Sequence, residues 1–504
     1  MLALAVVFAL QIAATRDRLA GPFLDTRLHY SYDNALYGFQ IRNGLRDADP
    51  RSQFGVTVAA YDRWGRASGP PSYYTDHPFL MKALLQLYAR AAGVSEWTTR
   101  SFYLVVAAGT AAGLFAVLLA TTGSVFAAGA GAATLVTLPV FSVYQLCVKS
   151  EADGMLVAVW LYAVFVACLG RGTRGPRLAY TGLVVAAFLT HWTAILFVGV
   201  LSAYELLLAR RRPEVRRLLG TSAAASAAGL ALLLGLMSYL QRGWAGARET
   251  LTRSFGVRSL AIPFPEWSAR QLLYVQKNFT AAATLLSVVM LGLLVARVVR
   301  LGASRADGAA PEDPRGLALL EGFVLVTAAV AVLWVGLFPQ GSFVHVYWQY
   351  WFCLPIAALV AGTVAMAEAK RLLRTLARLA ACALVAGLFL AARRSYAGIA
   401  ADELGTPGDV EFLQTLRDDR YGRLVFVPLT DTPLTAWFQG PLFLYYTDRP
   451  IAVADRPGEL RPGDKLLVLR YTDRALAVKG LEDWSGRLLL HEKCGPRICA
   501  YDVE

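Results

Sequence analysis

The chain has 504 residues, of which 56% are hydrophobic and 17% are charged, and a formal net charge of +13. With a mean hydropathy of +0.46, this composition excludes a single water-soluble core, because long apolar runs recur along the sequence. Such runs are typical of a polytopic α-helical membrane protein. Much of the positive charge lies in short connectors between the runs, where it reports topology and gives no reason to expect nucleic acid as a partner.

A helix of about 20 apolar residues crosses the hydrocarbon core of a membrane, and the sequence contains about eleven such candidates. The first begins at Met1 and is short, so the true start of the protein could lie upstream. The candidate spans cover residues 1–15, 101–121, 124–145, 150–170, 178–193, 194–209, 218–240, 281–298, 317–338, 349–368 and 376–392.

Clusters of basic residues in alternate connectors predict the orientation. They occupy residues 171–177, 210–217, 297–315 and 370–378, and all four fall on the same side of an eleven-span arrangement. By the positive-inside rule that side is cytoplasmic. The first polar segment and the C-terminal tail are therefore expected outside the cytoplasmic membrane.

The sequence predicts two domains. Residues 1–395 form the transmembrane domain, in which residues 16–100 are a first outer loop with interfacial helices. Residues 396–504 alternate short β-rich runs with polar turns, which is typical of a small soluble α/β domain.

The end of the tail, LLLHEKCGPRICAYDVE, predicts a hairpin that turns at Gly495-Pro496. Cys494 and Cys499 flank this turn in an oxidising compartment, so they could form a disulfide or remain free thiols. The other four cysteines lie in or beside apolar runs, where packing is the expected role.

The connector 241–280 is predicted to be outside, yet it is basic and rich in aromatic residues. Basic residues beside interfacial aromatics indicate either an anionic partner at the membrane surface or anchoring of an interfacial helix to lipid head groups. The basic side chains of this connector are Arg242, Arg248, Arg253, Arg258, Arg270 and Lys277.

Two acids stand at the start of predicted amphipathic helices in the first outer loop. Asp33 precedes an apolar stripe that begins at Tyr37, and Asp76 precedes Pro78 and a second stripe. Either acid alone could simply cap its helix. Their presence in the same loop, beside other polar groups at outer helix ends, favours a shared cavity, since polar groups at such depth are mostly functional. These other groups are Tyr32, His77, Lys149, Glu151, Asp153, His191, His345 and Tyr347.

This pattern resembles the multispan C-type (GT-C) glycosyltransferases, and most closely the protein O-mannosyltransferase and lipid A aminoarabinose transferase group. An extracytoplasmic α/β tail also fits bacterial members of that group. The resemblance is carried by Asp33 in YDNALYGFQIRNG, the triplet Asp76-His77-Pro78, Glu151 and Asp153 at the start of a span, and HVYWQYW before Pro355.

The chain departs from the family pattern at three points. Pro78 is followed by Phe79, where members commonly have a second proline, and His191 stands where several relatives carry an acid or a lysine. No WWDYG-like sequence is present, which argues against an oligosaccharyltransferase of the same fold.

The resemblance implies transfer of a sugar from a polyprenyl-phosphate donor to an acceptor hydroxyl, with inversion. A lipid-linked donor explains why the sequence has no nucleotide-binding loop. The acceptor could be a glycan, a lipid or a protein. The reaction needs a carboxylate to take the acceptor proton, and cations to stabilise the departing lipid phosphate.

We therefore predict Asp33 as the base, with Asp76 orienting the acceptor or acting as the base instead. The six basic residues of the connector, with Lys82 or Lys149, are the candidates for the lipid phosphate. His345 and Tyr347 could contact the sugar or the phosphate. No cofactor is implied with certainty, although two acids could hold a divalent metal ion.

Two other classes remain open from the sequence. A transporter or lipid flippase would usually show internal repeats and ionisable groups near the midplane of the membrane, and neither pattern is evident here. A membrane scaffold whose outer domain binds a partner would give no reason for the pair of acids.

Overall fold

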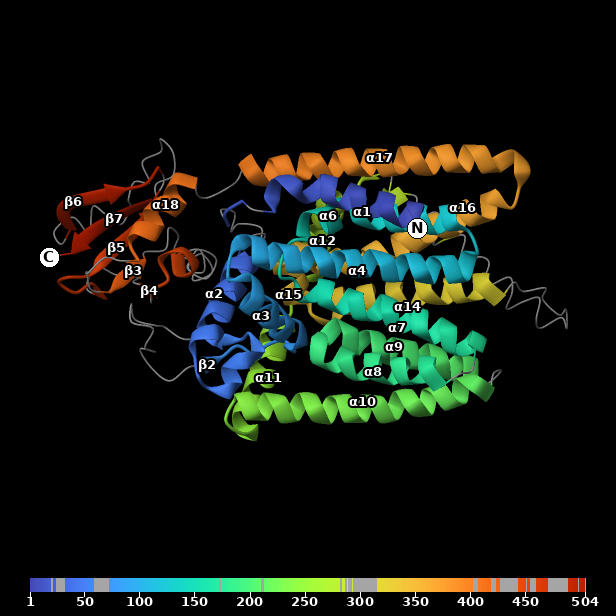
Figure 1. Cartoon of the computed structure of the whole chain (residues 1–504), viewed down its shortest axis with the longest axis horizontal. Helices are drawn as coiled ribbons and strands as arrows, with labels where there is room; N and C mark the ends of the chain where they lie inside the picture. The colour runs from blue at the N-terminus through green and yellow to red at the C-terminus, as the bar shows by residue number, and fades with distance from the viewer. Residues whose placement is uncertain are drawn as a thin grey trace. The chain divides into compact units, whose positions relative to one another are not determined.

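The structure is a computed structural model of the chain (Figure 1). It divides into two compact units: unit 1 comprises Met1–Arg16, Thr75–Met81 and Tyr103–Tyr396, and unit 2 comprises Asp17–Tyr74, Lys82–Phe102 and Ala397–Glu504. The described residues are 1–19, 21–23, 32–58, 72–171, 174–209, 213–281, 283–285, 288, 292, 315–401, 407–417, 423–426, 443–449, 451–453, 459–469, 488–496 and 498–503.

In the described part of unit 1 the secondary structure is helical, and its long helices run beside one another (Figure 1). Two further helices, α3 (Leu80–Ala92) and α4 (Glu96–Thr122), cross from one unit into the other. The helices of unit 1 are α1 (Leu2–Thr15), α5 (Val125–Thr137), α6 (Pro139–Tyr144), α7 (Ser150–Arg171), α8 (Arg174–Thr190), α9 (Trp192–Ala209), α10 (Pro213–Leu240), α11 (Trp244–Arg258), α12 (Phe264–Asn278), α14 (Arg315–Leu337), α15 (Pro339–Val344), the 3-10 helix η3 (Val346–Phe352), α16 (Cys353–Glu368) and most of α17 (Arg371–Ala401).

Within the described residues, six helices are long and apolar enough to cross a membrane. They lie within α4, α7, α10, α14, the continuous run of η3 and α16, and α17. Two shorter apolar helices cover Val125–Thr137 and Trp192–Leu208. The predicted span 281–298 falls mostly outside the described residues, so the count of eleven stays a prediction. The chain is a polytopic α-helical membrane protein.

The predicted span 124–145 differs from the structure, which has two helices there. Ser124 caps α5 by accepting a hydrogen bond from the main-chain N–H of Ala127. Helix α5 then ends before Leu138, which has an extended ψ of 130°, and Pro139 begins α6. Proline disfavours a helical conformation in the residue before it, which explains the break.

Unit 2 contains a five-stranded mixed sheet of order β4-β3-β5-β7-β6. Strand β3 pairs in parallel with both β4 and β5, whereas β7 pairs antiparallel with β5 and β6. A separate antiparallel pair joins β1 (Thr57–Val58) and β2 (Ser72–Tyr73). The strands of the larger sheet are β3 (Leu424–Phe426), β4 (Ile451–Val453), β5 (Lys465–Leu469), β6 (Leu488–Cys494) and β7 (Ile498–Val503).

Strands β6 and β7 form a hairpin around Gly495-Pro496, as the sequence indicates. Its register pairs Cys494 with Cys499, and Cys499 is disulfide-bonded. The cysteines outside this hairpin are free thiols.

The core of unit 2 joins the predicted loop 16–100 to the C-terminal segment. Phe23 and Ala35 from the loop pack with buried residues of α18 (Pro407–Thr415), of a short helix over 443–447, and of strands β5 and β7. The structure groups much of this predicted loop with the C-terminal segment in unit 2. Shared apolar burial explains this grouping. The outer position of the loop and the domain bounds 1–395 and 396–504 stay predictions.

The predicted stripe of α2 (Tyr32–Arg46) is buried in unit 2, as shown by Tyr37 and Ile41. Helix α3 behaves differently, because its apolar residues Leu84 and Leu87 are exposed while Lys82 on the other face is buried. An apolar exposed face is what an interfacial helix presents to lipid.

Gly55 allows the chain to pass close to Lys82. Its φ is +70°, which glycine adopts without a steric cost, and an added Cβ would meet the main-chain carbonyl of Lys82.

Candidate active site

Unit 1 holds the Asp76-His77-Pro78 motif in an irregular segment that is anchored from two directions. Gln241 donates a 2.6 Å hydrogen bond to the hydroxyl of Thr75, and the indole of Trp192 donates one of 2.9 Å to the carbonyl of Asp76. These contacts hold this segment in place, and neither of them involves the carboxylate of Asp76.

That carboxylate lies 3.8 Å from a guanidinium nitrogen of Arg253. The side chain of Asp76 is 20% exposed and that of Arg253 is 65% exposed. An ion pair this long and this exposed contributes little to stability. Both groups therefore stay accessible to a ligand that reaches this part of unit 1.

His77 connects a cation to a buried histidine. Arg258 contacts His77 Nε2 at 3.2 Å, and His77 Nδ1 contacts His191 Nε2 at 3.1 Å, with the rings stacked at a centroid distance of 5.1 Å. His191 Nδ1 in turn lies 2.8 Å from the hydroxyl of Thr193. Asp76, His77, His191, Arg253 and Arg258 are called the Asp76 cluster below.

The main chain beside His191 holds its ring in place. The main-chain N–H of Thr193 donates a 3.2 Å hydrogen bond to His191 Nδ1, so this nitrogen accepts. Arginine can only donate, and the guanidinium of Arg258 faces Nε2 of His77. The stacked histidine rings therefore lie between a cation and a main-chain donor.

A second set of polar residues in unit 1 centres on Lys149. This lysine is 2% exposed, and its ammonium nitrogen lies 3.7 Å from the ring centroid of Tyr347 and 5.8 Å from that of Tyr144. Such cation–π contacts stabilise a buried ammonium. The ring of His345 lies 5.3 Å from that of Tyr347. The geometry therefore brings Lys149 beside His345 and Tyr347, which lie far from it in the sequence.

Burial, with the positive charges of Lys149 and Arg258, lowers the pKa of His345 to about 3. His345 is therefore neutral at physiological pH and can contact a sugar or a phosphate only as a neutral hydrogen-bonding group. The shared influence of Lys149 and Arg258 also links the lysine set to the Asp76 cluster within unit 1.

The lowered pKa of His345 predicts a pH-dependent stability. An unfolded histidine binds a proton below a pH of about 6.5, so the unfolded chain takes up this proton first as the pH falls. The stabilisation is complete above about pH 6.5 and is lost between about 6.5 and 3, with about 2 kcal/mol lost at pH 5. Thermal unfolding in detergent at pH 7 and pH 5 measures this loss of stability. We expect His345→Gln to lose less stability than the unchanged chain between pH 7 and pH 5. Equal losses in the two proteins would contradict the assignment of this pH dependence to His345.

Glu151 and Asp153 lie buried in the first turn of α7. The hydroxyl of Tyr103 donates a 3.2 Å hydrogen bond to Asp153. Negative charge at a helix N-terminus is stabilised by the helix dipole, which favours ionised acids at both positions. Their role in substrate binding stays a prediction.

The structure separates the six cations of the basic connector. Arg258 is half-buried and contacts His77, Arg253 faces Asp76, and Arg270 stacks on Phe343 with a distance of 4.9 Å to the ring centroid. The other three are exposed: Arg242, Arg248 and Lys277.

Unit 2 brings together two other predicted residues around Tyr37. Asp33 is half-buried in the first turn of α2, one helical turn before Tyr37, and the ammonium of Lys82 lies 4.9 Å from the Tyr37 ring centroid. Because Asp33 and Asp76 belong to different units, their expected common cavity stays a prediction. The side chain of Tyr32 lies outside the described residues.

No protein-family model matches the sequence, and no curated protein matches it. Among solved structures, the chain is similar to an Archaeoglobus fulgidus oligosaccharyltransferase in its apo form, with a TM-score of 0.59 and 10% identity over 93% of this chain and 69% of that one. It is also similar to ArnT from Cupriavidus metallidurans bound to undecaprenyl phosphate, with a TM-score of 0.58 and 14% identity over 99% of this chain and 97% of that one. These neighbours are GT-C glycosyltransferases. The chain has the GT-C fold.

A further neighbour of the GT-C fold is the arabinofuranosyltransferase AftD from Mycobacteria, with a TM-score of 0.50 and 16% identity. This chain is covered over 99% of its length but spans only 41% of AftD. The resemblance read from the sequence is thus confirmed at the level of the GT-C fold.

The GT-C fold of this chain carries no metal cluster in its described residues, since no three or more His, Cys, Asp or Glu side chains gather there to hold an ion. Sequence reasoning missed Thr75, Thr193 and Gln241, which hold the Asp76 cluster in place. Gln241 and Thr193 are polar residues at the ends of apolar runs, and Thr75 lies in a polar segment, so none of them carries more than a weak signal that many loop residues share.

Proposed function

We propose that the chain is a membrane glycosyltransferase that moves a sugar from a polyprenyl-phosphate donor to an acceptor hydroxyl, with inversion, at the extracytoplasmic face. The GT-C fold supports this proposal, as does a neighbour of that fold that binds undecaprenyl phosphate. The observation that supports this proposal is the Asp76 cluster, because an accessible carboxylate and two guanidinium groups gather there around the stacked rings of His77 and His191.

Sugar transfer from a lipid phosphate requires a carboxylate and cations in different roles. The acceptor oxygen bonds to the anomeric carbon as the bond from that carbon to the lipid phosphate breaks, and a carboxylate takes the acceptor proton. Negative charge grows on the departing phosphate, where fixed cations stabilise it. Arg258 suits this role through its planar fork, with Arg253 and the buried Lys149 adding positive charge.

Asp33 is proposed as the base and Asp76 as the acid that orients the acceptor. Asp76 already faces Arg253, which suits a positioning group. Asp33 lies beside Tyr37, whose ring is covered by the buried cation of Lys82. Lys82 follows Asp76 by only six positions in the sequence. A short stretch of chain therefore connects the Asp76 cluster to the residues around Tyr37.

The proposal is tested with the purified full chain and a panel of radiolabelled polyprenyl-phosphate sugars. Membrane lipids, envelope glycans and envelope proteins are offered as acceptors, and the transfer of label and the release of polyprenyl phosphate are measured. We expect both to occur together for one donor. Movement of the labelled lipid between vesicle leaflets without any transfer would instead identify a flippase and overturn the proposal.

A further inference from the structure

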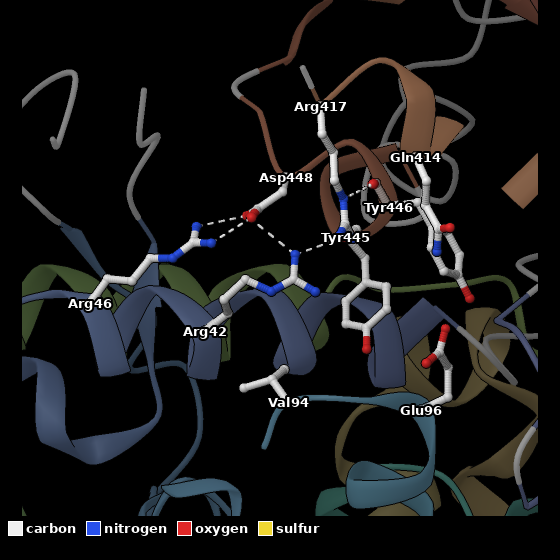
Figure 2. A pocket seen from close by; sticks show the side chains of 9 residues that line it. All are labelled: Arg42, Arg46, Val94, Glu96, Gln414, Arg417, Tyr445, Tyr446 and Asp448. Carbon is white, nitrogen blue, oxygen red and sulfur yellow. Dashed lines mark hydrogen bonds and ion pairs between the residues drawn. The ribbon is translucent and has the colours of Figure 1, made fainter. Parts of the chain in front are cut away.

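Unit 2 has a polar pocket of about 290 Å³ that the Asp76 cluster does not share (Figure 2). Ligand pockets usually measure about 300–1,000 Å³, so this one suits a small group rather than a lipid chain. Its lining residues are Arg42 and Arg46 of α2, Val94, Glu96 at the start of α4, and Gln414, Arg417, Tyr445, Tyr446 and Asp448 from the C-terminal segment. It is called the arginine pocket below.

Asp448 neutralises the two arginines of α2 only in part. It accepts hydrogen bonds of 2.8 and 2.5 Å from Arg46 and lies 3.2 Å from Arg42 (Figure 2). Burial favours its neutral form, but the contacts with Arg46 and Arg42 outweigh this and lower the pKa of Asp448. One ionised carboxylate is thus shared by two guanidinium groups.

Arg417 adds a third positive charge on the opposite wall. Its Nε donates a 2.7 Å hydrogen bond to the main-chain carbonyl of Tyr446, and its two terminal nitrogens have no partner among the described residues. Burial, and then the charge of Arg42, lower the pKa of Arg417. The guanidinium groups of Arg42, Arg46 and Arg417 therefore lie close enough to repel one another, and a bound anion would reduce this repulsion.

The remaining acid of the pocket lies on a different side. In Figure 2 Glu96 lies nearest the hydroxyl end of Tyr446, away from Arg46. Tyr445 and Tyr446 belong to the buried core of unit 2, and the ring of Tyr445 supports Arg42 at 4.7 Å. The tyrosine rings behind the guanidinium groups are packed in the core of unit 2, which holds these groups in position for a ligand.

We propose that the arginine pocket binds an oxyanion, a phosphate or carboxylate group, on the forks of Arg417 and Arg42. Arginine forks match the geometry of both groups and form charge-assisted hydrogen bonds with them. That this group is part of the acceptor rests on the proposed function. The pocket would then hold the acceptor by an anionic group distant from the hydroxyl that reacts.

Binding is tested with inorganic phosphate, titrated by calorimetry into the purified full chain at constant ionic strength with chloride as the balancing anion. We expect Arg417→Gln to weaken phosphate binding about tenfold, since charge-assisted contacts are lost. Asp448→Asn should strengthen it by a similar factor, because the competing carboxylate is removed. Asn suits the φ of +52° at this position, so the backbone is kept. Arg461→Gln, an exposed arginine of the same unit, is the matched control and should bind phosphate as the unchanged chain does.

Arg417→Gln and Asp448→Asn are expected to change the affinity for phosphate in opposite directions, which a general loss of stability would not do. If Asp448→Asn only lowers the melting temperature and binds phosphate no better, the cluster is an ion-pair clamp and the proposal is wrong. Equal affinity in all variants would place the phosphate elsewhere and would also overturn it.

A transfer assay then distinguishes an acceptor group from free phosphate. Arg417→Gln should raise the KM for the acceptor about tenfold and leave the KM for the donor unchanged, and inorganic phosphate should compete with the acceptor. Phosphate binding without such competition would overturn the assignment to the acceptor. If the chain transfers no sugar at all, the calorimetric arm still tests the anion site, so the two failures are distinguishable.

Discussion

Replacing Asp33 with asparagine is expected to lower kcat for sugar transfer by a factor of about 10² to 10⁴, the usual contribution of a general base. Asparagine keeps the size of the side chain but cannot take the acceptor proton. The KM for the donor should stay close to its original value, because Asp33 is not assigned to the lipid phosphate. Initial rates with a labelled polyprenyl-phosphate donor measure both constants.

Two further variants make the result specific to Asp33. Asp76→Asn should raise the KM for the acceptor and lower kcat less, as expected for a positioning group that faces Arg253. Asp47→Asn is the matched control, since Asp47 is also a half-buried acid beside α2 but bonds to Ser52. If Asp76→Asn abolishes transfer while Asp33→Asn turns over normally, the roles of the two acids are reversed.

Replacing Arg258 with glutamine is expected to raise the donor KM and to lower kcat by a factor of about 10² to 10³, as when one preorganised donor to a developing anion is lost. Arg258 is the half-buried cation of the basic connector and contacts His77. For Arg258→Lys we expect kcat and the donor KM to lie between those of the unchanged chain and those of Arg258→Gln, because lysine keeps the charge but not the planar fork.

Arg248 provides the comparison, since it lies on the same helix α11 but is exposed. We expect Arg248→Gln to change either constant less than twofold, as for a solvated charge. Equal effects of Arg248→Gln and Arg258→Gln would indicate head-group anchoring by the whole connector. An effect of Arg258→Gln on the acceptor KM alone would contradict the phosphate role.

Sequence patterns predicted local features well where one physical term dominates. Apolar runs predicted helices such as α4, α7 and α14, because the cost of exposing backbone polar groups to lipid leaves few alternatives. The stripe at Tyr37 and Ile41 predicted an apolar face for an interfacial helix, since helical spacing puts these residues together, and the structure buries this face of α2 within unit 2. The motif at Asp76 and His77 was found because its residue types are unusual beside spans.

Which cation of the connector enters the site was not predictable from sequence. Arg248, Arg253 and Arg258 have the same chemistry and lie on one helix, so only the packing of α11 against its neighbours separates an exposed guanidinium from one that contacts His77. The stacking of His77 on His191 has the same origin, because more than a hundred residues separate them in the chain.

The sequence by itself determined the membrane class, most helices and the likeness to the GT-C fold, because hydropathy and short motifs act over a few residues. The tertiary structure alone decided that residues of the predicted loop 16–100 share a core with the C-terminal segment, and that Arg42 meets Arg417 and Asp448 in one pocket. Contacts between residues about 400 positions apart depend on how the intervening helices pack, and no local pattern records that packing.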